Sequence, residues 1–275
     1  MNHEALEALP NDTYWFLFHK DEILVKDEDG VITIPCGSDL KGFTNQPIDA
    51  QSIGIFHEQE CFIASISKEN IPAGFSFKAV RPLYGNMDDE YFWFACRAFH
   101  LFNWMKTTKF CGCCGSSMNL LSSEIAMKCS NCGHLVYPRI SPAIIVAVVK
   151  ENQLLLARSK RFPPNRYSVI AGFVEPGETI EECVIRELKE EVGIEVENIK
   201  YFGSQPWSFP DSLMVAFTAK AVTEEIKIDN DEIVAADWFT PHNLPDLPDK
   251  PSVGRQLIDW FTEKYKDMSI TPQKG

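Results

Sequence analysis

The residues with the clearest chemical meaning in this sequence are three glutamates, Glu187, Glu190 and Glu191. Their spacing of i, i+3 and i+4 places all three carboxylates on one face of a helix. Carboxylates crowded in this way repel one another unless cations neutralise them, and hard oxygen ligands suit Mg²⁺ or Mn²⁺. The spacing therefore predicts a divalent metal site. Such a site polarises phosphate groups, orients and deprotonates a water molecule, and neutralises the charge of a leaving phosphate.

A run of glutamates is more often a solvated helix face, but the neighbouring residues favour a metal site here. Gly172 and Gly193 flank the helical stretch at predicted loop positions, and Arg186 supplies a positive charge beside the glutamates. The adjacent face of the same helix carries an apolar residue at every fourth position, which predicts that the helix packs on a sheet. These residues are Ile180, Val184, Leu188 and Val192.

Two Cys-x2-Cys pairs form a second candidate metal site. They are Cys111 with Cys114, and Cys129 with Cys132. Four thiolates at this spacing suit one tetrahedral zinc ion, and a fully thiolate site leaves no position for water, so the predicted role is structural. The two-residue spacing favours the paired cysteines over Cys113. His134 is a less favoured alternative to the last cysteine of the second pair.

Length, composition and charge limit the surfaces on which this chemistry takes place. The chain has 275 residues, of which 45% are hydrophobic and 24% charged, and this predicts two domains, or one domain with a large extension, and no long disordered arm. The formal net charge of -13 argues against a broad basic surface that binds nucleic acid through phosphates alone. We expect an anionic substrate to be held locally, by bound cations and a few basic residues.

The sequence shows no sign of secretion or of membrane insertion. The first residues lack a basic segment followed by an apolar one, and the longest apolar run, 143–149, is far shorter than the ~20 residues of a membrane helix. The metal-type cysteine pairs are typical of a reducing compartment. We therefore expect a cytoplasmic protein without a membrane partner.

The elements that must position these residues fall into two kinds of region. Short apolar or alternating runs between Tyr14 and Val80 predict strands, and the helical period of 88–107 predicts a helix with one apolar face. After Pro142, strands and helices interleave, which predicts a mixed sheet between helices. The expected elements are a hairpin within 143–157, a helix at 179–192, a strand near 213–219 and a helix near 253–264. No internal repeat is visible.

The stretch from Gly172 to Ile194 resembles the Nudix box, Gly-x5-Glu-x7-Arg-Glu-apolar-x-Glu-Glu-x-Gly-apolar, at every fixed position, with Glu178 as the first glutamate. With the cysteine pairs and the segment SQPWSFPDS at 204–212, the chain is similar to the NADH pyrophosphatase branch of the Nudix family. The likeness has specific motifs over roughly 110–255 and extends to the preceding region only in layout.

The resemblance implies a fold and a division into domains. The implied class is α/β (α+β), with a β-rich N-terminal domain, a zinc ribbon and a Nudix α/β/α sandwich around a mixed sheet. The expected boundaries are 1–108 for the first domain, 109–138 for the ribbon, 139–268 for the catalytic domain and 269–275 for a C-terminal tail.

The resemblance also implies an activity. Members of this branch hydrolyse NAD(H) to nicotinamide mononucleotide and AMP, remove NAD caps from RNA, and form homodimers. The aromatic helix at 91–104 agrees with a dimer, because it offers more apolar surface than one small domain needs. One alternative is a general ADP-sugar or dinucleotide pyrophosphatase. Another is a zinc-ribbon nucleic-acid-binding regulator with an inactive Nudix domain, against which the intact carboxylates argue.

By the same resemblance, the Mg²⁺ or Mn²⁺ ligands are the backbone carbonyl of Ala171 and the carboxylates of Glu187, Glu191 and Glu232. Asp229 and Asp231 lie close to Glu232 in sequence and stay alternatives to it. The catalytic group implied by the box is Glu178, Arg186, Glu187, Glu190 and Glu191.

The resemblance places substrate contacts in several segments. Tyr137 and Phe173 match aromatic residues that flank the bases, although either could instead belong to a core. Arg81, Glu124 and Gly254 match further contact positions. The loop after the box lines the substrate pocket, the alternative being a proline-rich loop around a buried tryptophan, and Ser208 stands where the family has proline. Its residues are Gln205, Pro206, Trp207, Ser208, Phe209, Pro210, Asp211 and Ser212.

Overall fold

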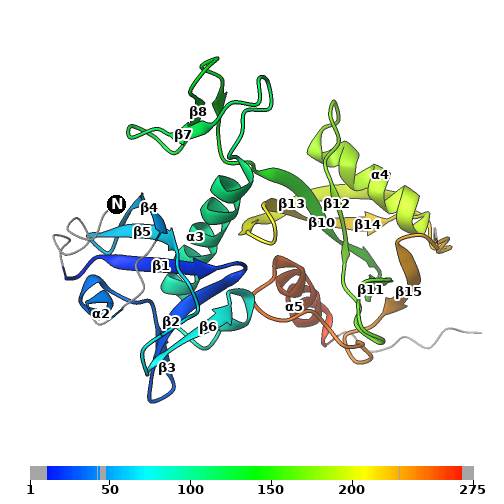
Figure 1. The fold of residues 1–275 in the computed structure, drawn as a ribbon. Helices are drawn as coiled ribbons and strands as arrows, with labels where there is room; N and C mark the ends of the chain where they lie inside the picture. Colours follow the sequence, from blue (N-terminus) through cyan, green and yellow to red (C-terminus); the bar gives the residue numbers. More distant parts are fainter. Residues whose placement is uncertain (1–10, 42, 44–47, 229, 268–275) are drawn as a thin grey trace, which may run out of the picture. The chain divides into compact units, whose positions relative to one another are not determined.

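The computed structural model describes residues 11–267 except 42, 44–47 and 229 (Figure 1). The expected tail at 269–275 and the alternative ligand Asp229 lie outside the described residues. The chain divides into two compact units, Met1–Arg139 with Ser208–Pro210, and Ile140–Trp207 with Asp211–Gly275. None of the helices in the described part is long and apolar enough to cross a membrane.

The second unit is built on a mixed sheet with the strand order β13-β14-β10-β11-β15, and β12 pairs with β10. Only the β10–β14 pairing is parallel. The elements are β10 (Ser141–Lys150), β11 (Gln153–Ser159), β12 (Ile170–Phe173), α4 (Ile180–Val192), β13 (Val196–Trp207), β14 (Ser212–Ala221), β15 (Ile233–Phe239) and α5 (Val253–Tyr265). The predicted hairpin, helices and strand of this region are confirmed.

Strand β10 is buried on both faces, which explains why its sequence is a continuous apolar run. Ile144 and Val146 pack in a core with residues of α4, whereas Ile145 and Ala147 pack in a second core with residues of α5. A strand alternates its side chains between the two faces of a sheet, so a strand covered on both faces must be apolar at every position. The predicted sandwich of a mixed sheet between helices is confirmed.

Helix α4 begins and ends where its sequence predicts. The Thr179 hydroxyl accepts the backbone N–H of Glu182 at 3.2 Å, and the Glu182 carboxylate accepts the backbone N–H of Thr179 at 2.7 Å, which is a capping box. Gly193 follows the last turn with a φ of 70°, a left-handed conformation that favours glycine. Val184, Leu188 and Val192 of the predicted apolar stripe are fully buried, and Ile180 is half-buried against the same core.

The first unit is also built on a mixed sheet, in the order β3-β2-β1-β5-β4, with β6 paired to β2. Only the β1–β5 pairing is parallel. Its elements are β1 (Tyr14–His19), β2 (Glu22–Glu28), β3 (Val31–Thr33), α2 (Gly37–Leu40), β4 (Ile48–Phe56), β5 (Gln59–Ser65), β6 (Phe75–Ala79), the 3-10 turn η1 (Arg81–Leu83) and α3 (Asp89–Thr107). The predicted β-rich region and its closing helix are confirmed.

The prediction that α3 buries one face is wrong. The helical period places seven residues near one face, of which only three are buried; the seven are Tyr91, Phe94, Ala95, Ala98, Phe99, Phe102 and Met105, and the buried three are Ala95, Ala98 and Phe99. Phe92, Cys96, Leu101 and Trp104, which are not in that set, are buried as well. The same apolar cluster contains sheet residues and the ribbon residue Met118, so the helix is covered from more than one direction. Its aromatic side chains therefore pack largely inside the first unit.

The zinc ribbon forms a small antiparallel sheet within the first unit. Its strands are β7 (Met118–Leu120), β8 (Met127–Cys129) and β9 (Leu135–Val136), with β8 in the centre. The two cysteine pairs lie in and beside the turns of this sheet.

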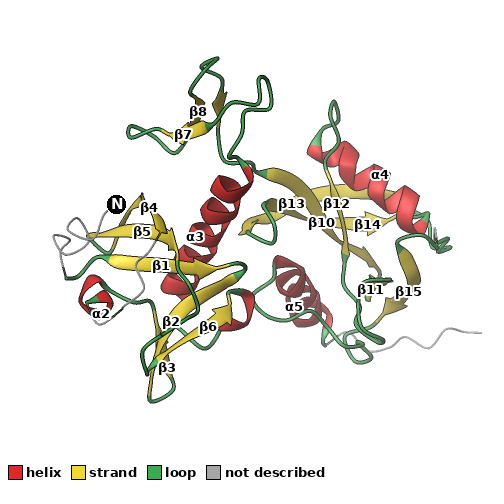
Figure 2. Cartoon of the chain, in the orientation of Figure 1, coloured by secondary structure: helices red, strands yellow, loops and turns green. Residues whose placement is uncertain are grey.

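The two units share an order of elements that the sequence does not show (Figure 2). Each has three strands, a helix, three strands and a second helix. In each, the first strand pairs with the second and is parallel to the fifth, the fourth pairs with the fifth, and the sixth pairs with the second. The expectation of no internal repeat is therefore wrong at the level of the fold, because the repeated feature is the strand pairing and not the side chains.

Candidate active site and zinc site

The four paired cysteines form a compact sulfur cluster. Their Sγ atoms all lie within 4.8 Å of one another, with 3.6 Å between Cys111 and Cys132 and 3.4 Å between Cys114 and Cys129. A zinc ion bound tetrahedrally at about 2.3 Å separates its sulfurs by about 3.8 Å, so the cluster fits this ion. The backbone N–H groups of Asn131 and Cys132 also point to Cys129 Sγ, each at 3.4 Å, as expected around a thiolate.

The alternative ligands Cys113 and His134 are not members of this cluster. Cys113 contributes its backbone N–H to Cys111 Sγ at 3.4 Å, and its own side chain is exposed. His134 contributes its carbonyl, which accepts the backbone N–H of Cys129 at 2.9 Å. Cys111 and Cys129 belong to the main apolar core of the first unit, so zinc bound here has a structural role.

The three glutamates of α4 have different surroundings. Glu191 is 9% exposed, and the side chain of Glu187 is 12% exposed, whereas the side chain of Glu190 is 61% exposed. Two of the carboxylates are therefore held against the protein and one faces solvent. A buried carboxylate is costly unless a cation or hydrogen bonds compensate its charge.

Gly172 lies in strand β12 and not in a loop, so the sequence-based reason for this glycine is wrong. A Cβ atom at Gly172 would lie 1.9 Å from Cδ of Glu187, which no structure tolerates. The Glu187 carboxyl group therefore rests on the backbone at Gly172, beside the residue Ala171. The box needs glycine here because a carboxylate occupies the space of its side chain.

The electrostatics of Glu187 link it to the acidic residue after the box. Burial raises the pKa of Glu187, hydrogen bonding from Arg186 opposes this, and the negative charges of Glu190 and Glu232 raise the pKa further. Glu232 thus lies within electrostatic reach of Glu187, although 45 positions separate them in the sequence. Oxygen donors with an excess of negative charge are the set that Mg²⁺ or Mn²⁺ prefers.

The carboxylates are more widely spread than the sulfurs. Among the residues that the structure describes, the cysteines form the only group of three or more candidate ligands with all donor atoms within 4.8 Å of one another. Arg186 holds the carboxylates instead, because its Nη1 donates to Glu187 at 2.9 Å and to Glu190 at 3.1 Å.

Arg186 also ties α4 to the loop before it. Its Nε and Nη2 donate to the two oxygens of Glu178 at 2.9 and 2.7 Å, and Nη2 donates to the carbonyl of Phe173 at 2.9 Å. This paired contact and the backbone N–H of Glu175 lower the pKa of Glu178 to about 2. Glu178 therefore anchors the loop that leads from β12 into α4.

The predicted stacking residues are on the surface. Phe173 is 56% exposed on β12, and Tyr137 is 55% exposed after the ribbon. The alternative that they belong to a core is wrong. An exposed ring on a rigid strand or ribbon is a suitable platform for a flat base.

The predicted substrate loop is a β-hairpin, in which Trp207 pairs with Ser212 across the turn. Gln205 is buried, and both ends of its amide bond to the backbone at the start of α5. Nε2 donates to the carbonyl of Pro251 at 2.9 Å, and Oε1 accepts the N–H of Val253 at 2.7 Å. Gln205 therefore positions α5, a role that its sequence context does not reveal, and a substrate contact through this side chain stays a prediction.

The remaining predicted contact residues differ in exposure. Ser208 is 3% exposed. The ring centroids of Phe209 and Phe99 are 5.7 Å apart, within the first unit. Pro206 and Pro210 are exposed, Trp207 and Asp211 are half-buried, and Ser212 is buried. Arg81 and Glu124 are exposed on the first unit, and Gly254 is buried in the second.

Three stretches of the chain match known protein-family models. Residues 139–261 match the NUDIX domain. Residues 12–104 match the NADH pyrophosphatase-like rudimentary NUDIX domain, and residues 106–137 match the NADH pyrophosphatase zinc ribbon domain. The match at 106–137 agrees with the sulfur cluster. The match at 12–104 to a rudimentary NUDIX domain explains the element order that the two units share.

Curated relatives match almost the whole chain. A protein of Pseudomonas aeruginosa named NAD-capped RNA hydrolase NudC is 38% identical over 247 residues, which are 90% of this chain and 88% of the relative. A protein of the same name from Pseudomonas putida is 41% identical over 77% of each chain. Among solved structures, a NUDIX hydrolase from Nitrosomonas europaea matches 57% of this chain and 92% of its own with a TM-score of 0.50. Its identity is 22%, and the match supports the fold alone.

Proposed function

Because this chain belongs to the Nudix hydrolase family, among relatives named NAD-capped RNA hydrolases, we propose that it hydrolyses the diphosphate of NAD(H) to nicotinamide mononucleotide and AMP and removes NAD caps from RNA. The observation that carries this proposal is the placement of the Glu187 carboxyl group on the backbone of Gly172, between α4 and β12. A carboxylate buried there serves no packing purpose, whereas a cation site requires it.

We assign the Mg²⁺ or Mn²⁺ ligands to the carbonyl of Ala171 and the carboxylates of Glu187, Glu191 and Glu232. The burial of Glu187 and Glu191 and the charge of Glu232 near Glu187 support this set. When bound, the ions supply charge neutralisation for the diphosphate and lower the pKa of water.

The protein's own groups then position this chemistry. Arg186 holds the buried Glu187 and the exposed Glu190 in place on α4, and Glu178 fixes Arg186. Phe173 stands at the end of β12, next to Gly172, where its exposed ring can stack on a base. Tyr137 has the same exposed character on the first unit.

A substrate panel with product identification tests the proposal. NADH, NAD⁺, ADP-ribose, diadenosine diphosphate and an NAD-capped RNA are each incubated with zinc-loaded protein and Mg²⁺ or Mn²⁺. We expect nicotinamide mononucleotide from the NAD substrates, and ¹⁸O water shows which phosphorus is attacked. Faster hydrolysis of ADP-ribose than of every NAD substrate would instead support the ADP-sugar alternative.

We also propose a homodimer, a cytoplasmic location and the domain boundaries stated above. The exposed rings of Phe110 and Tyr137 beside the ribbon support a surface for the second copy. Helix α3 does not support it, because its apolar side chains are largely buried within the first unit. The four thiolates support a reducing compartment. The family matches at 12–104, 106–137 and 139–261 support the boundaries near 108 and 138. Light scattering at micromolar concentration tests the dimer, and a monomeric mass would contradict it.

A further inference from the structure

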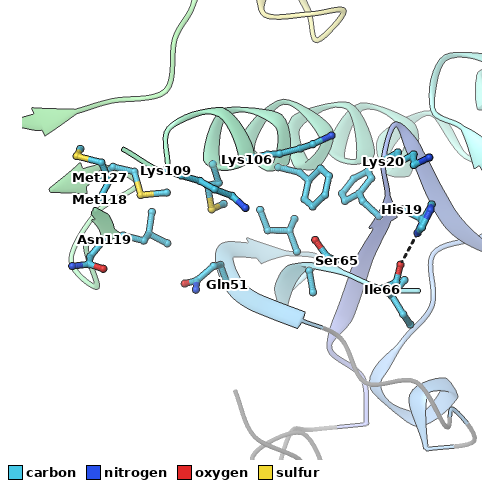
Figure 3. A pocket seen from close by; sticks show the side chains of 16 residues that line it. His19, Lys20, Gln51, Ser65, Ile66, Lys106, Lys109, Met118, Asn119 and Met127 are labelled. Carbon is cyan, nitrogen blue, oxygen red and sulfur yellow. Dashed lines mark hydrogen bonds between the residues drawn. The ribbon is translucent and has the colours of Figure 1, made fainter. Parts of the chain in front are cut away.

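The first unit contains a pocket that takes no part in the diphosphate chemistry. Its volume is about 580 Å³, within the range of roughly 300–1,000 Å³ that is usual for small-molecule sites. The end of β1, the end of β5, residue Gln51 of β4, the last turn of α3 and the strands of the zinc ribbon form its walls (Figure 3). Every lining residue belongs to the first unit, and none lies in the Nudix box.

The charge of this pocket is opposite to that of the protein. The formal net charge of the chain is -13, yet the lining includes Lys20, Lys106 and Lys109 and no carboxylate. In the described part of the chain, none of these three ammonium groups has a carboxylate within 4.0 Å, whereas eleven other lysine or arginine side chains do. Three unpaired lysines around one opening make a local site for an anion.

The end of helix α3 lies beside two of these lysines. Carbonyl groups at a helix C-terminus together carry about half a negative charge, which is smaller than the full positive charge of each lysine. Two of these carbonyls have hydrogen-bond partners, because the hydroxyl of Thr107 donates to the carbonyl of Asn103 at 2.9 Å and the N–H of Thr108 donates to the carbonyl of Trp104 at 2.9 Å. The lysines therefore leave a net positive charge at the pocket.

The rest of the lining suits a flat, largely apolar body. Phe102 and Met105 come from α3, and Met118 and Met127 come from the ribbon. Methionine sulfur and aromatic rings make favourable contacts with flat rings. The amides of Gln51 and Asn119 also line the pocket, and each can both donate and accept hydrogen bonds, as the edge of a nucleobase does. Figure 3 shows Lys106 and Lys109 on the helix side of the pocket, Gln51 and Ser65 on the strand side, and Lys20 beside His19 at the end away from the ribbon.

We propose that this pocket binds a nucleoside monophosphate, with its phosphate at the lysines and its base on the methionine and phenylalanine side chains. The site is separate from the catalytic residues, and the proposal does not rest on the activity proposed above. Because four wall residues come from the ribbon strands, zinc binding also shapes the pocket.

Methyl NMR of methionine tests the proposal at the pocket itself. The chain has seven methionines, of which Met105, Met118 and Met127 line the pocket and Met214 lies in the second unit. Full-length, zinc-loaded protein labelled at the methionine methyl carbon is titrated with AMP without added divalent ions. We expect saturable shifts of the three pocket methyls, whereas any binding at the second unit is reported separately by Met214.

Two charge reversals give a matched comparison. Lys109→Glu removes a pocket lysine and should weaken the AMP response about tenfold to a hundredfold, since a hydrogen bond to a charged group is lost. Lys128→Glu makes the same change at an exposed position of β8 outside the pocket and should leave the response unchanged. If Lys109→Glu does not fold, Lys106→Gln replaces it, and the ligand-free methyl spectrum reports the fold of each variant.

Three further ligands test which chemical class of ligand the pocket binds. Adenosine should bind much more weakly than AMP, because it lacks the phosphate. Inorganic phosphate should also bind more weakly, because it lacks the body, and equal binding of phosphate would overturn the nucleoside part of the proposal. Tighter binding of an uncapped hexaribonucleotide than of AMP would show a site for an RNA chain instead. Pocket methyls that do not shift with millimolar AMP would refute the proposal.

Discussion

The two sheet units of this protein have the same order of elements but differ in the helix between the third and fourth strands. In the second unit this helix is α4, with thirteen residues and the glutamates proposed as metal ligands. In the first unit it is α2, with four residues, Gly37–Leu40. The two units therefore differ in the length and the acidic face of one helix, which is where we propose that the diphosphate chemistry resides.

The single acidic residue of α2 serves the local fold. The Asp39 carboxylate accepts the backbone N–H of Cys36 at 2.8 Å and lies 3.1 Å from the ammonium group of Lys26. Hydrogen bonds from Cys36 and the Lys26 charge lower the pKa of Asp39, although its partial burial opposes this. The Asp39 carboxylate is thus compensated by Lys26, whereas Glu191 is buried on the same helix as Glu187 and Glu190, where we propose a cation site.

The final helices of the two units also diverge. Helix α5 keeps one apolar face on its sheet, with Leu257 and Phe261 buried. Helix α3 is buried more widely because the ribbon packs on it as well. The rudimentary unit has thus become a support for the zinc ribbon, which the catalytic unit lacks.

The largest expected effect is a loss of turnover on substitution of Glu191 in the second unit, with Asp39 in the first unit as the comparison. Glu191→Gln should lower kcat for NADH by at least about a thousandfold with the fold intact, because the amide keeps the shape and removes a metal-ligand charge. The matched change Asp39→Asn should leave kcat unchanged and only lower stability. Release of nicotinamide mononucleotide measures turnover, and circular dichroism reports folding. A folded Glu191→Gln protein with near-normal release would remove the metal-centred mechanism.

Double variants test whether the proposed ligands act together. Glu187→Gln and Glu232→Gln should each cost orders of magnitude in kcat. Combined with Glu191→Gln, they should add little further loss, because the ligands work as a unit. Additive losses would indicate independent roles.

The next effect tests the contact between β12 and α4. Gly172→Ala places a methyl group on the Glu187 carboxyl and should lower kcat about a hundredfold, since displacement by about 1 Å is enough for such a loss. Gly203→Ala, in β13, meets no atom within 4 Å and should be close to wild type in turnover. Steady-state kinetics of both variants is measured at saturating Mg²⁺. Equal kcat values would contradict the placement of the Glu187 carboxyl group on the backbone of Gly172.

A smaller effect concerns substrate affinity. Phe173→Ala should raise KM for NADH about tenfold with little change in kcat, because stacking on a base contributes roughly 1–3 kcal/mol. Phe110→Ala removes a similarly exposed ring from the first unit and should leave KM unchanged. If Phe110→Ala raises KM as much as Phe173→Ala, stacking at β12 is not the cause.

Glu178→Gln should lower kcat by only about tenfold, because Glu178 positions Arg186 and does not bind the metal itself. It should also destabilise the protein in a pH-dependent way. The pKa of Glu178 falls from an ordinary 4.5 to about 2 on folding, so its contribution is present above pH 4.5 and is lost as the pH falls toward 2. Urea unfolding of wild type and variant should therefore converge as the pH falls below 4.5. A constant gap would exclude the Arg186 contact as its source.

The smallest effect on turnover is expected at the zinc. Structural zinc contributes about 10 kcal/mol or more to small metal-dependent domains, so Cys111→Ser should lower stability by several kcal/mol. Turnover should stay near normal at temperatures where the variant is folded. Cys113→Ser should change neither. Elemental analysis and thermal unfolding measure both variants, and zinc loss from Cys113→Ser alone would reverse the ligand assignment.

Local patterns in the sequence were enough to determine α4 and the zinc cluster. The capping residues and apolar stripe of α4 follow from a period of 3.6 residues, and the Cys-x2-Cys spacing places two sulfurs within one turn. These features depend on residues a few positions apart, so their geometry is readable before the chain folds.

Only the tertiary structure decided what depends on residues far apart. It set Gly172 under the carboxyl group of Glu187, placed Glu232 near that same group, and used Gln205 to hold the start of α5. It also covered α3 from more than one direction and repeated most of the strand pairings in two unlike sequences, all except that of the third strand. Strand pairing is made by backbone groups that every residue carries, so its repetition leaves no mark in the side-chain sequence.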